Sequence, residues 1–366
     1  MKDNIIMLKY YAAVGTLALS TTAVDAGGWE TGRLDTGFLY QDGSYVEASY
    51  GSLDYSVNAT STTFAKHSMA KDQKRMSVSG KFQIGSFDFG LTSFGSGAIQ
   101  MDGQNAVGTS VVPSADVKLN TQALMARYSF SDKYSIIGGV RQAKLKTSTL
   151  NTVAPADYSI KAVDKSGIVY GLAYERSDIA LKFEVLRSEK IKIELTGDVL
   201  FGGNHLVTGS LVIPEATTIN FQTGIADNTL LMASAHRVNW TGSDVILNVA
   251  DAPPLDALNQ ASEFSNTTSY SLGLGRRLNE QTSASLTYSW EKGTNPGGKS
   301  ESPFTMSNGS ETLSFGVQHK IGLMTISGGV SYTKVGDVDV THSTSLTASY
   351  AGNSVTAVGI KVGYNF

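Results

Sequence analysis

Basic residues lie at strand positions where they could bind an anion. Arg127, Arg141 and Lys361 each lie in a segment of alternating polar and apolar residues, on its polar face. Successive side chains of a strand point to opposite faces, so these cations would point away from the apolar side. A guanidinium or ammonium group binds a carboxylate through charge-assisted hydrogen bonds. We therefore predict these three residues as substrate-binding candidates; the alternative is that they are hydrated or pair with neighbouring acids.

The remaining reactive side chains do not suggest catalysis. Of the five histidines, His67, His205 and His342 fall in or beside predicted loops. His342 and Ser343 are the nearest approach to a nucleophile and base, but neighbours on a strand point to opposite faces. Cysteine is absent, and no His, Asp and Glu set has the spacing of metal ligands. We expect no enzymatic activity, no cofactor and no metal site.

Composition narrows the class of protein. Only 17% of the 366 residues are charged, 38 are glycine, and the net charge is -3, so nothing indicates a nucleic-acid partner. Mean hydropathy is -0.07, and no apolar run reaches the roughly 18 residues of a spanning helix. A transmembrane β-barrel fits both facts, because its lipid-facing residues alternate with polar ones that face the lumen.

The two ends of the chain favour export. Lys9 precedes an apolar core at 10–19, and small residues through Ala26 resemble a cleavage site. We expect residues 1–26 to be a signal peptide; a buried N-terminal helix is the alternative. The last segment, VTAVGIKVGYNF, alternates and ends on Phe366. It resembles the closing strand of outer-membrane barrels, which would engage the barrel-assembly machinery, although a half-buried strand of a soluble sandwich would also alternate.

Alternating segments continue along the whole chain and predict an all-β, antiparallel barrel. An even number of strands is the rule for such barrels. Fourteen segments are of a length to cross a bilayer: 43–54, 75–85, 86–95, 117–130, 133–147, 160–175, 178–189, 214–226, 228–240, 267–277, 280–291, 310–321, 323–335 and 354–366. The segment around 190–215 is left open, as either a strand extension or a separate hairpin.

The connections also alternate in length. Short turns, as at Gly85-Ser86 and Asp227-Asn228, alternate with long polar segments such as 97–116, 241–266 and 292–309. Short turns on one side and long loops on the other are typical of outer-membrane barrels.

Strand periodicity assigns the faces of the barrel. Residues predicted to face lipid are Val78, Phe82, Leu124, Tyr128, Phe130, Ile136, Tyr170, Tyr174, Phe183, Leu286, Tyr288, Trp290, Phe315, Val317, Ile326, Tyr332 and Phe366. Residues predicted to face the lumen are Glu47, Lys81, Asp88, Arg127, Arg141, Glu175, Lys182, Glu184, Arg277 and Lys361. The aromatic residues gather near the strand ends, as two interfacial girdles would.

Three segments resemble the FadL-type family of long-chain fatty-acid transporters. GRLDTGFLYQDGSYVEASYG (32–51) is similar to the opening of short family members, and INFQTGIADNTLLMASAHRVNW (219–240) to a strand pair that ends in tryptophan. YSLGLGRRLNEQTSASLTYSWEKGTNPGG (270–298) resembles a hairpin with an Asn-Pro loop, followed here by Ser302-Pro303. The resemblance implies a monomeric fourteen-stranded barrel in the bacterial outer membrane.

The resemblance also implies a mechanism. Family members take up hydrophobic small molecules, either long-chain fatty acids or aromatic hydrocarbons, and release them sideways to the lipid bilayer. By position, the plugging hatch would be residues 27–42 and the barrel 43–366, with Trp29, Leu34, Phe38 and Leu39 as apolar hatch contacts, the last two also binding substrate. A kink in the third strand would open the wall; Gly90, Gly95 and Gly97 are its candidates, because glycine in a strand marks bulges.

The main competing function is that of a general diffusion porin for small hydrophilic solutes. A porin needs a wide polar lumen with rings of charge at a constriction. Lumen-facing charges predicted here are sparse and mixed in sign, which favours the hydrophobic-uptake interpretation.

Overall fold

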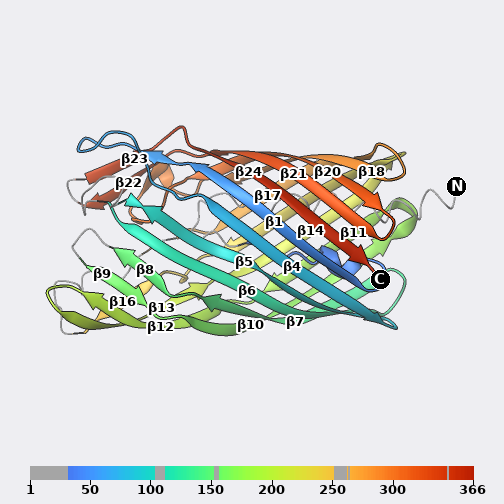
Figure 1. Cartoon of the computed structure of the whole chain (residues 1–366), viewed down its shortest axis with the longest axis horizontal. Coiled ribbons are helices and arrows are strands. Elements are labelled where there is room, and N and C mark those ends of the chain that lie inside the picture. Colours follow the sequence, from blue (N-terminus) through green and yellow to red (C-terminus); the bar gives the residue numbers. More distant parts are fainter. Residues whose placement is uncertain (1–31, 104–111, 152–155, 251–261, 263, 344–345) are drawn as a thin grey trace.

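A computed structural model describes residues 32–103, 112–151, 156–250, 262, 264–343 and 346–366. Within them, fourteen antiparallel strands close a barrel (Figure 1), as predicted. The ring consists of β1 (Tyr45–Ser56), β4 (Gln73–Ile84), β5 (Phe87–Asp102), β6 (Ser114–Ser129), β7 (Tyr134–Leu145), β10 (Val163–Arg176), β11 (Leu181–Ser188), β14 (Glu215–Ala226), β15 (Thr229–Asn239), β17 (Thr267–Arg277), β18 (Thr282–Lys292), β20 (Gly309–Ile321), β21 (Met324–Val335) and β24 (Ser354–Asn365). First and last strands pair from Tyr45↔Asn365 to Ser56↔Ser354, which removes both sheet edges.

The two ends of the barrel differ, and we call them the turn end and the loop end. At the turn end, tight turns join neighbouring strands, and Gly85, Asn228 and Gly322 have φ of 57°, 58° and 58°. Such turns need a left-handed residue, which Gly and Asn supply at low cost. The C-terminus also lies at this end (Figure 1). Of the helices in the described residues, none is long and apolar enough to cross a membrane.

Further strands lie at the loop end. Those that extend the sheet of the wall are β8 (Ser148–Asn151), β9 (Asp157–Ile160), β12 (Ile191–Leu200), β13 (Asn204–Ile213) and β16 (Ile246–Val249). Two small separate sheets consist of β2 (Asn58–Ala59) with β3 (His67–Ser68), and of β19 (Lys299–Ser300), β22 (Val338–Ser343) and β23 (Leu346–Tyr350). The open segment 190–215 is therefore a separate hairpin, β12–β13, which pairs with β9 and β16.

The prediction that 97–116 is a loop was wrong for much of its length. Strand β5 runs on to Asp102, and β6 begins at Ser114. These residues still alternate, but with Ile99, Met101, Ala115 and Val117 pointing inward. An interior apolar pattern is the opposite of the membrane-spanning one, so it was not recognised as strand.

Strand β6 shows how the polarity of the wall inverts along the barrel. Near the turn end, Leu124 is 63% exposed on the outer face while Arg127 faces the lumen. Toward the loop end, Lys118 is exposed outside and Val117 and Leu119 are buried inside. On β6, the outer face is thus apolar only over its turn-end part, which belongs to the band that lipid can cover.

The loop end encloses an apolar core. Buried side chains from the far halves of β1, β5 and β6 join those of the added strands in one cluster that includes Leu53, Met101, Ile193, Trp240 and Tyr350. The sheet pairing thus carries the strands beyond the apolar band, where they pack around this core.

The predicted facing of the spanning strands agrees with the exposed fractions. Val78, Phe82 and Leu286 are more than half exposed, whereas Glu47, Lys81 and Glu184 are buried inside. Aromatic rings stack near both edges of the apolar band: Phe87 with Tyr128, Phe130 with Tyr134 and Tyr134 with Tyr174 at the turn end, and Tyr270 and Tyr288 with Trp290 toward the loop end.

Candidate functional site

Residues 32–41, which we call the luminal segment, run inside the barrel and touch several walls. At one end the Gly32 amide donates to the Ser96 carbonyl of β5. Next, Arg33 donates to the hydroxyls of Ser234 on β15 and Ser269 on β17, the latter at 2.7 Å. The segment then forms the short 3-10 helix η2 (Gly37–Tyr40). These contacts fix the segment across the lumen rather than along one strand.

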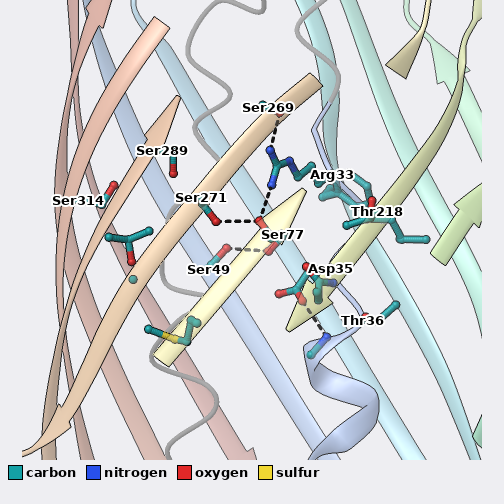
Figure 2. Close-up of a pocket in the computed structure, with 18 of the residues that line it drawn as sticks. Arg33, Asp35, Thr36, Ser49, Ser77, Thr218, Ser269, Ser271, Ser289 and Ser314 are labelled. Atoms are coloured by element: carbon teal, nitrogen blue, oxygen red, sulfur yellow. Dashed lines mark hydrogen bonds between the residues drawn. The ribbon is translucent and has the colours of Figure 1, made fainter. Parts of the chain in front are cut away.

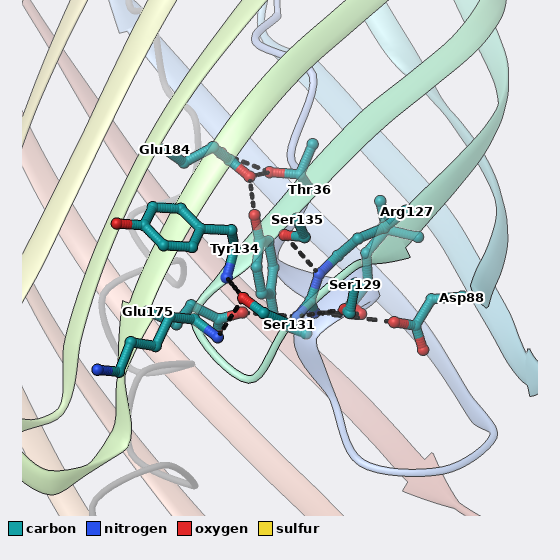
Figure 3. Close-up of polar contacts among 12 residues, drawn as sticks. Thr36, Asp88, Arg127, Ser129, Ser131, Tyr134, Ser135, Glu175 and Glu184 are labelled. Carbon is teal, nitrogen blue, oxygen red and sulfur yellow. Dashed lines mark hydrogen bonds and ion pairs between the residues drawn. The ribbon is translucent and has the colours of Figure 1, made fainter. Parts of the chain in front are cut away.

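A buried carboxylate anchors η2 near the turn end (Figure 3). Glu184, which has no exposed surface, accepts hydrogen bonds from the Thr36 hydroxyl at 2.8 Å and the Tyr40 hydroxyl at 2.6 Å. Asn220 on β14 donates to the same carboxylate at 2.9 Å. Burial, and then the nearby Glu184 charge, raises the pKa of the Tyr40 phenol, so the phenol remains the proton donor.

Cations complete this anchor. The guanidinium carbon of Arg127 lies 4.1 Å and the Lys182 Nζ 4.2 Å from the centre of the Tyr40 ring, within the range of cation–π attraction. Arg127 also donates to the Leu39 carbonyl at 3.3 Å. We call Thr36, Tyr40, Arg127, Lys182 and Glu184 the latch.

Ion pairs hold the cations of this region in place. Arg127 forms an ion pair with Glu175 at 2.6 Å and lies 3.8 Å from Asp88. Asp88 in turn forms an ion pair with Lys81 at 2.6 Å. Lys81 also donates to the Leu39 carbonyl at 3.5 Å. Lys81, Asp88 and Arg127 therefore each have an opposite charge nearby, as the cost of burying an isolated ion demands.

Apolar packing adds to the anchor. Phe38 and Leu39 are 1% and 0% exposed and pack with Ala123, Met125 and other wall residues. They fit because Gly90 on β5 has no side chain. A Cβ at this position would lie 2.5 Å from a ring carbon of Phe38 and 2.5 Å from a methyl carbon of Leu39. Gly90 thus provides a close approach between wall and luminal segment.

A chamber of about 330 Å³ lies beside the luminal segment (Figure 2). Its lining is rich in hydroxyl groups, including those of Ser49, Ser77, Ser271, Ser289 and Ser314. Some are already paired, as are Ser49 with Ser77 at 2.6 Å and Ser234 with Ser271 at 2.7 Å. Leu53 lines the chamber and belongs to the apolar core, so the chamber adjoins the loop-end core.

The chamber reaches an interruption in the wall between β4 and β5. These strands pair from Ile84↔Phe87 to Ser77↔Phe94 and then separate. Beyond Phe94, β5 continues only with β6, and the register shifts between Gly95 and Gly97, which leaves Ser96 as the extra residue of a bulge. Contact with the chain leading into β4 returns only at the Ala70↔Met101 bridge. We call the interval between 72–76 and 95–99 the wall gap.

The chamber lining includes residues from both sides of this gap. Arg75, Met76 and Ser77 contribute from β4, and Phe94 and Gly95 from β5. Of the predicted kink residues, Gly95 and Gly97 thus flank the bulge, whereas Gly90 pairs regularly with Met125.

The predicted substrate-binding residues lie in different surroundings. Lys361 lines the chamber but lies 3.3 Å from Glu47. Arg127 belongs to the latch, and Arg141 donates to the carbonyls of Glu189 and Pro214. Each of these three cations already contacts other protein groups, whereas a carboxylate-binding site needs a cation whose donors are available to the ligand.

Of the apolar candidates in the described residues, Leu34 lines the chamber, whereas Phe38 and Leu39 do not. Phe38 and Leu39 fill the space under Gly90, and Leu34 packs beside them while lining the chamber. Trp29, the remaining hatch candidate, lies outside the described residues.

Sequence reasoning missed Arg33 and the serine-rich lining. A signal was present: in β17, β18 and β20, hydroxyl residues recur at every second position, as in Ser269 and Ser271 or Thr312 and Ser314. Small polar residues are common on any lumen-facing strand, so this pattern alone does not indicate a binding surface.

Comparison with known proteins identifies the fold. No protein-family model and no curated protein matches the chain. A solved FadL homologue from Pseudomonas aeruginosa superposes with a TM-score of 0.73 at 12% identity, over 90% of this chain and 92% of that one. The Pseudomonas putida toluene transporter TodX superposes with a TM-score of 0.65 at 13% identity, over 93% of this chain and 96% of that one. The Ralstonia pickettii toluene transporter TbuX superposes with a TM-score of 0.60 at 15% identity, over 89% of this chain and 90% of that one. The sequence resemblance is therefore confirmed at the level of the fold: this chain has the barrel fold of the FadL-type proteins.

Proposed function

We propose that this protein takes up hydrophobic small molecules across the bacterial outer membrane and releases them sideways through the wall gap. The observation that carries the proposal is the combination of a lumen crossed by the luminal segment with a chamber that reaches an unpaired stretch of wall. The solved structures with the same fold agree with this proposal, because they are a FadL homologue and the toluene transporters TodX and TbuX.

The location follows from the surface. The apolar band and its aromatic edges fit a bilayer, and outer-membrane barrels keep short turns in the periplasm and long connections outside. The turn end would then face the periplasm and the loop end the exterior. Residues 1–26 would be removed on export, and the strand ending at Phe366 would engage the assembly machinery; we expect a monomer.

The route would begin at the loop-end core. The free energy of a hydrophobic molecule falls when it moves from water into apolar surroundings. The loop-end core provides such surroundings next to the chamber. From the chamber, the wall gap would lead to lipid at the edge of the apolar band, since Gly95 pairs with Asn120, between Lys118 and Leu124 of β6. Movement straight to the periplasm would require the latch to open, with the loss of its charge-assisted hydrogen bonds.

The same features argue against a general diffusion porin. Such a pore needs a continuous aqueous path. Here, Glu184 from β11 and Arg127 from β6 bind the luminal segment from separate parts of the wall, and Phe38 and Leu39 fill space between them.

Removing the bulge tests the lateral route. Deletion of Ser96 brings Gly95 and Gly97 into regular register with β6, which allows β5 to straighten toward β4. Deletion of Ile225 is a matched control, because it removes the extra residue of a bulge in β14 at the turn end, away from the chamber. Each variant would be produced in a host that lacks its own transporter, and initial uptake of labelled oleate and toluene measured.

We expect saturable uptake by the unaltered protein and by the Ile225 deletion, and loss of uptake after Ser96 deletion in a barrel that still shows heat-modifiable mobility. Unchanged uptake without Ser96 would refute the lateral route. Free passage of sugars, with no saturable uptake of either hydrophobic probe by the unaltered protein, would favour the porin instead.

A further inference from the structure

The chamber lining combines apolar surface with many hydroxyl groups. Fourteen of its 36 lining residues are serine or threonine, contributed by strands around the ring and by the luminal segment. A hydroxyl group that loses water to a hydrocarbon and gains no new partner is destabilised. A pure hydrocarbon should therefore bind in this chamber more weakly than a molecule of the same shape that also offers a hydrogen-bonding group.

Two of these hydroxyls are available to a ligand. Ser289 on β18 and Ser314 on β20 project into the chamber (Figure 2) and form no hydrogen bond with the described part of the chain. They lie on adjacent strands, where Ser314 pairs with Thr287, one step along the same face from Ser289. A hydroxyl can both donate and accept, so together they can bind one oxygen in either sense.

The charges of the lining favour a neutral ligand. Four basic residues, Arg33, Arg75, Lys182 and Lys361, are matched by three acids, Asp35, Glu47 and Glu291. The most closely placed pair is Lys361 with Glu47 at 3.3 Å. A carboxylate would enter an almost balanced field, whereas a neutral hydroxyl would exchange hydrogen bonds with the serines.

Size and the remaining surface suggest the rest of the molecule. About 330 Å³ is near the lower limit of small-molecule pockets. Apolar lining is contributed at the wall gap by Phe94 and Met76. The lining thus offers a small molecule both an apolar surface for a ring and hydroxyl groups for an oxygen.

We propose that the chamber binds small aromatic compounds carrying one neutral hydroxyl group, such as simple phenols, in preference to hydrocarbons of the same shape. This inference rests on the proposed function and narrows its substrate class. The polar lining then acts as a selectivity filter before lateral release.

The test compares p-cresol with p-xylene, which differ by a hydroxyl in place of a methyl group. The full-length protein, reconstituted in nanodiscs, would be assayed by equilibrium dialysis with each labelled compound, alongside cellular uptake of both. The variant is the double substitution Ser289→Ala and Ser314→Ala. The control is Ser331→Ala, which removes a buried hydroxyl of β21 that has no hydrogen-bond partner among the described residues and does not line the chamber.

We expect p-cresol to bind about tenfold more tightly than p-xylene. The double variant should weaken p-cresol binding about tenfold, at about threefold per hydroxyl, and leave p-xylene binding equal or stronger. Ser331→Ala should change neither.

Equal binding of the two compounds with saturable uptake of both would overturn this inference and leave the proposed function standing. Equal weakening of both compounds in the double variant would overturn it as well. Absence of saturable binding and uptake for both compounds would overturn the inference together with the proposed function.

Discussion

Substitution of Gly90 by alanine should loosen the luminal segment without unfolding the barrel. The new Cβ would lie 2.5 Å from both Leu39 Cδ2 and Phe38 Cε2, where carbon atoms prefer about 3.5–4.0 Å. Since Phe38 and Leu39 are already fully packed, the segment must shift, at the cost of about 1–3 kcal/mol that overpacking usually carries.

This cost can be compared with what holds the segment. Burial of Phe38 and Leu39 contributes about 1.5–3 kcal/mol each, and the Glu184 hydrogen bonds add more. Alanine should therefore not expel the segment, but it should raise the population of its released state by about five- to 150-fold.

Hydrogen exchange measures this population directly. The amides of Leu39 and Gln41 donate to the carbonyls of Thr36 and Phe38, so they exchange when η2 opens. Protection of a peptide covering residues 33–42 should fall by the stated factor in Gly90→Ala, with increased entry of a hydrophilic antibiotic.

Gly138→Ala on β7 is the control, because nothing lies within 4 Å of a Cβ there. Wild-type protection in a folded Gly90→Ala barrel would refute the packing argument. So would an equal loss of protection in both variants.

Glu184→Gln keeps the shape of the side chain but replaces charge-assisted hydrogen bonds by neutral ones, so it should weaken the latch by about 1–3 kcal/mol. The loss should be measurable as antibiotic entry and as faster hydrogen exchange of η2, and an unchanged exchange rate would contradict it. Leu124→Arg places a charge in the apolar band and should cost about 2–4 kcal/mol, whereas Ser129→Arg, on the lumen face near a turn, should assemble normally in a heat-modifiability gel. N-terminal sequencing of outer-membrane material should find the mature chain beginning at or near Gly27; retention of the preceding residues would exclude a cleaved signal.

Much of the barrel could be predicted from sequence because its determinants are local. A strand exposes alternate residues to lipid and lumen, and this period of two is visible without knowledge of any partner. Tight turns likewise depend on single residues such as Gly85 and Asn228. The strand count and the facing of Leu124 and Glu184 followed from these rules.

Tertiary structure decided everything that depends on which strands meet across the lumen. The latch joins Tyr40 to Arg127 and Glu184 from separate parts of the wall, and the chamber collects serines from strands far apart in sequence. The apolar interior of the loop end inverts the membrane pattern because those strands leave the bilayer, a boundary that no local signal marks. The wall gap depends on pairing that β4 and β5 do not make, and alternation within each strand is the same whether its neighbour is present or absent.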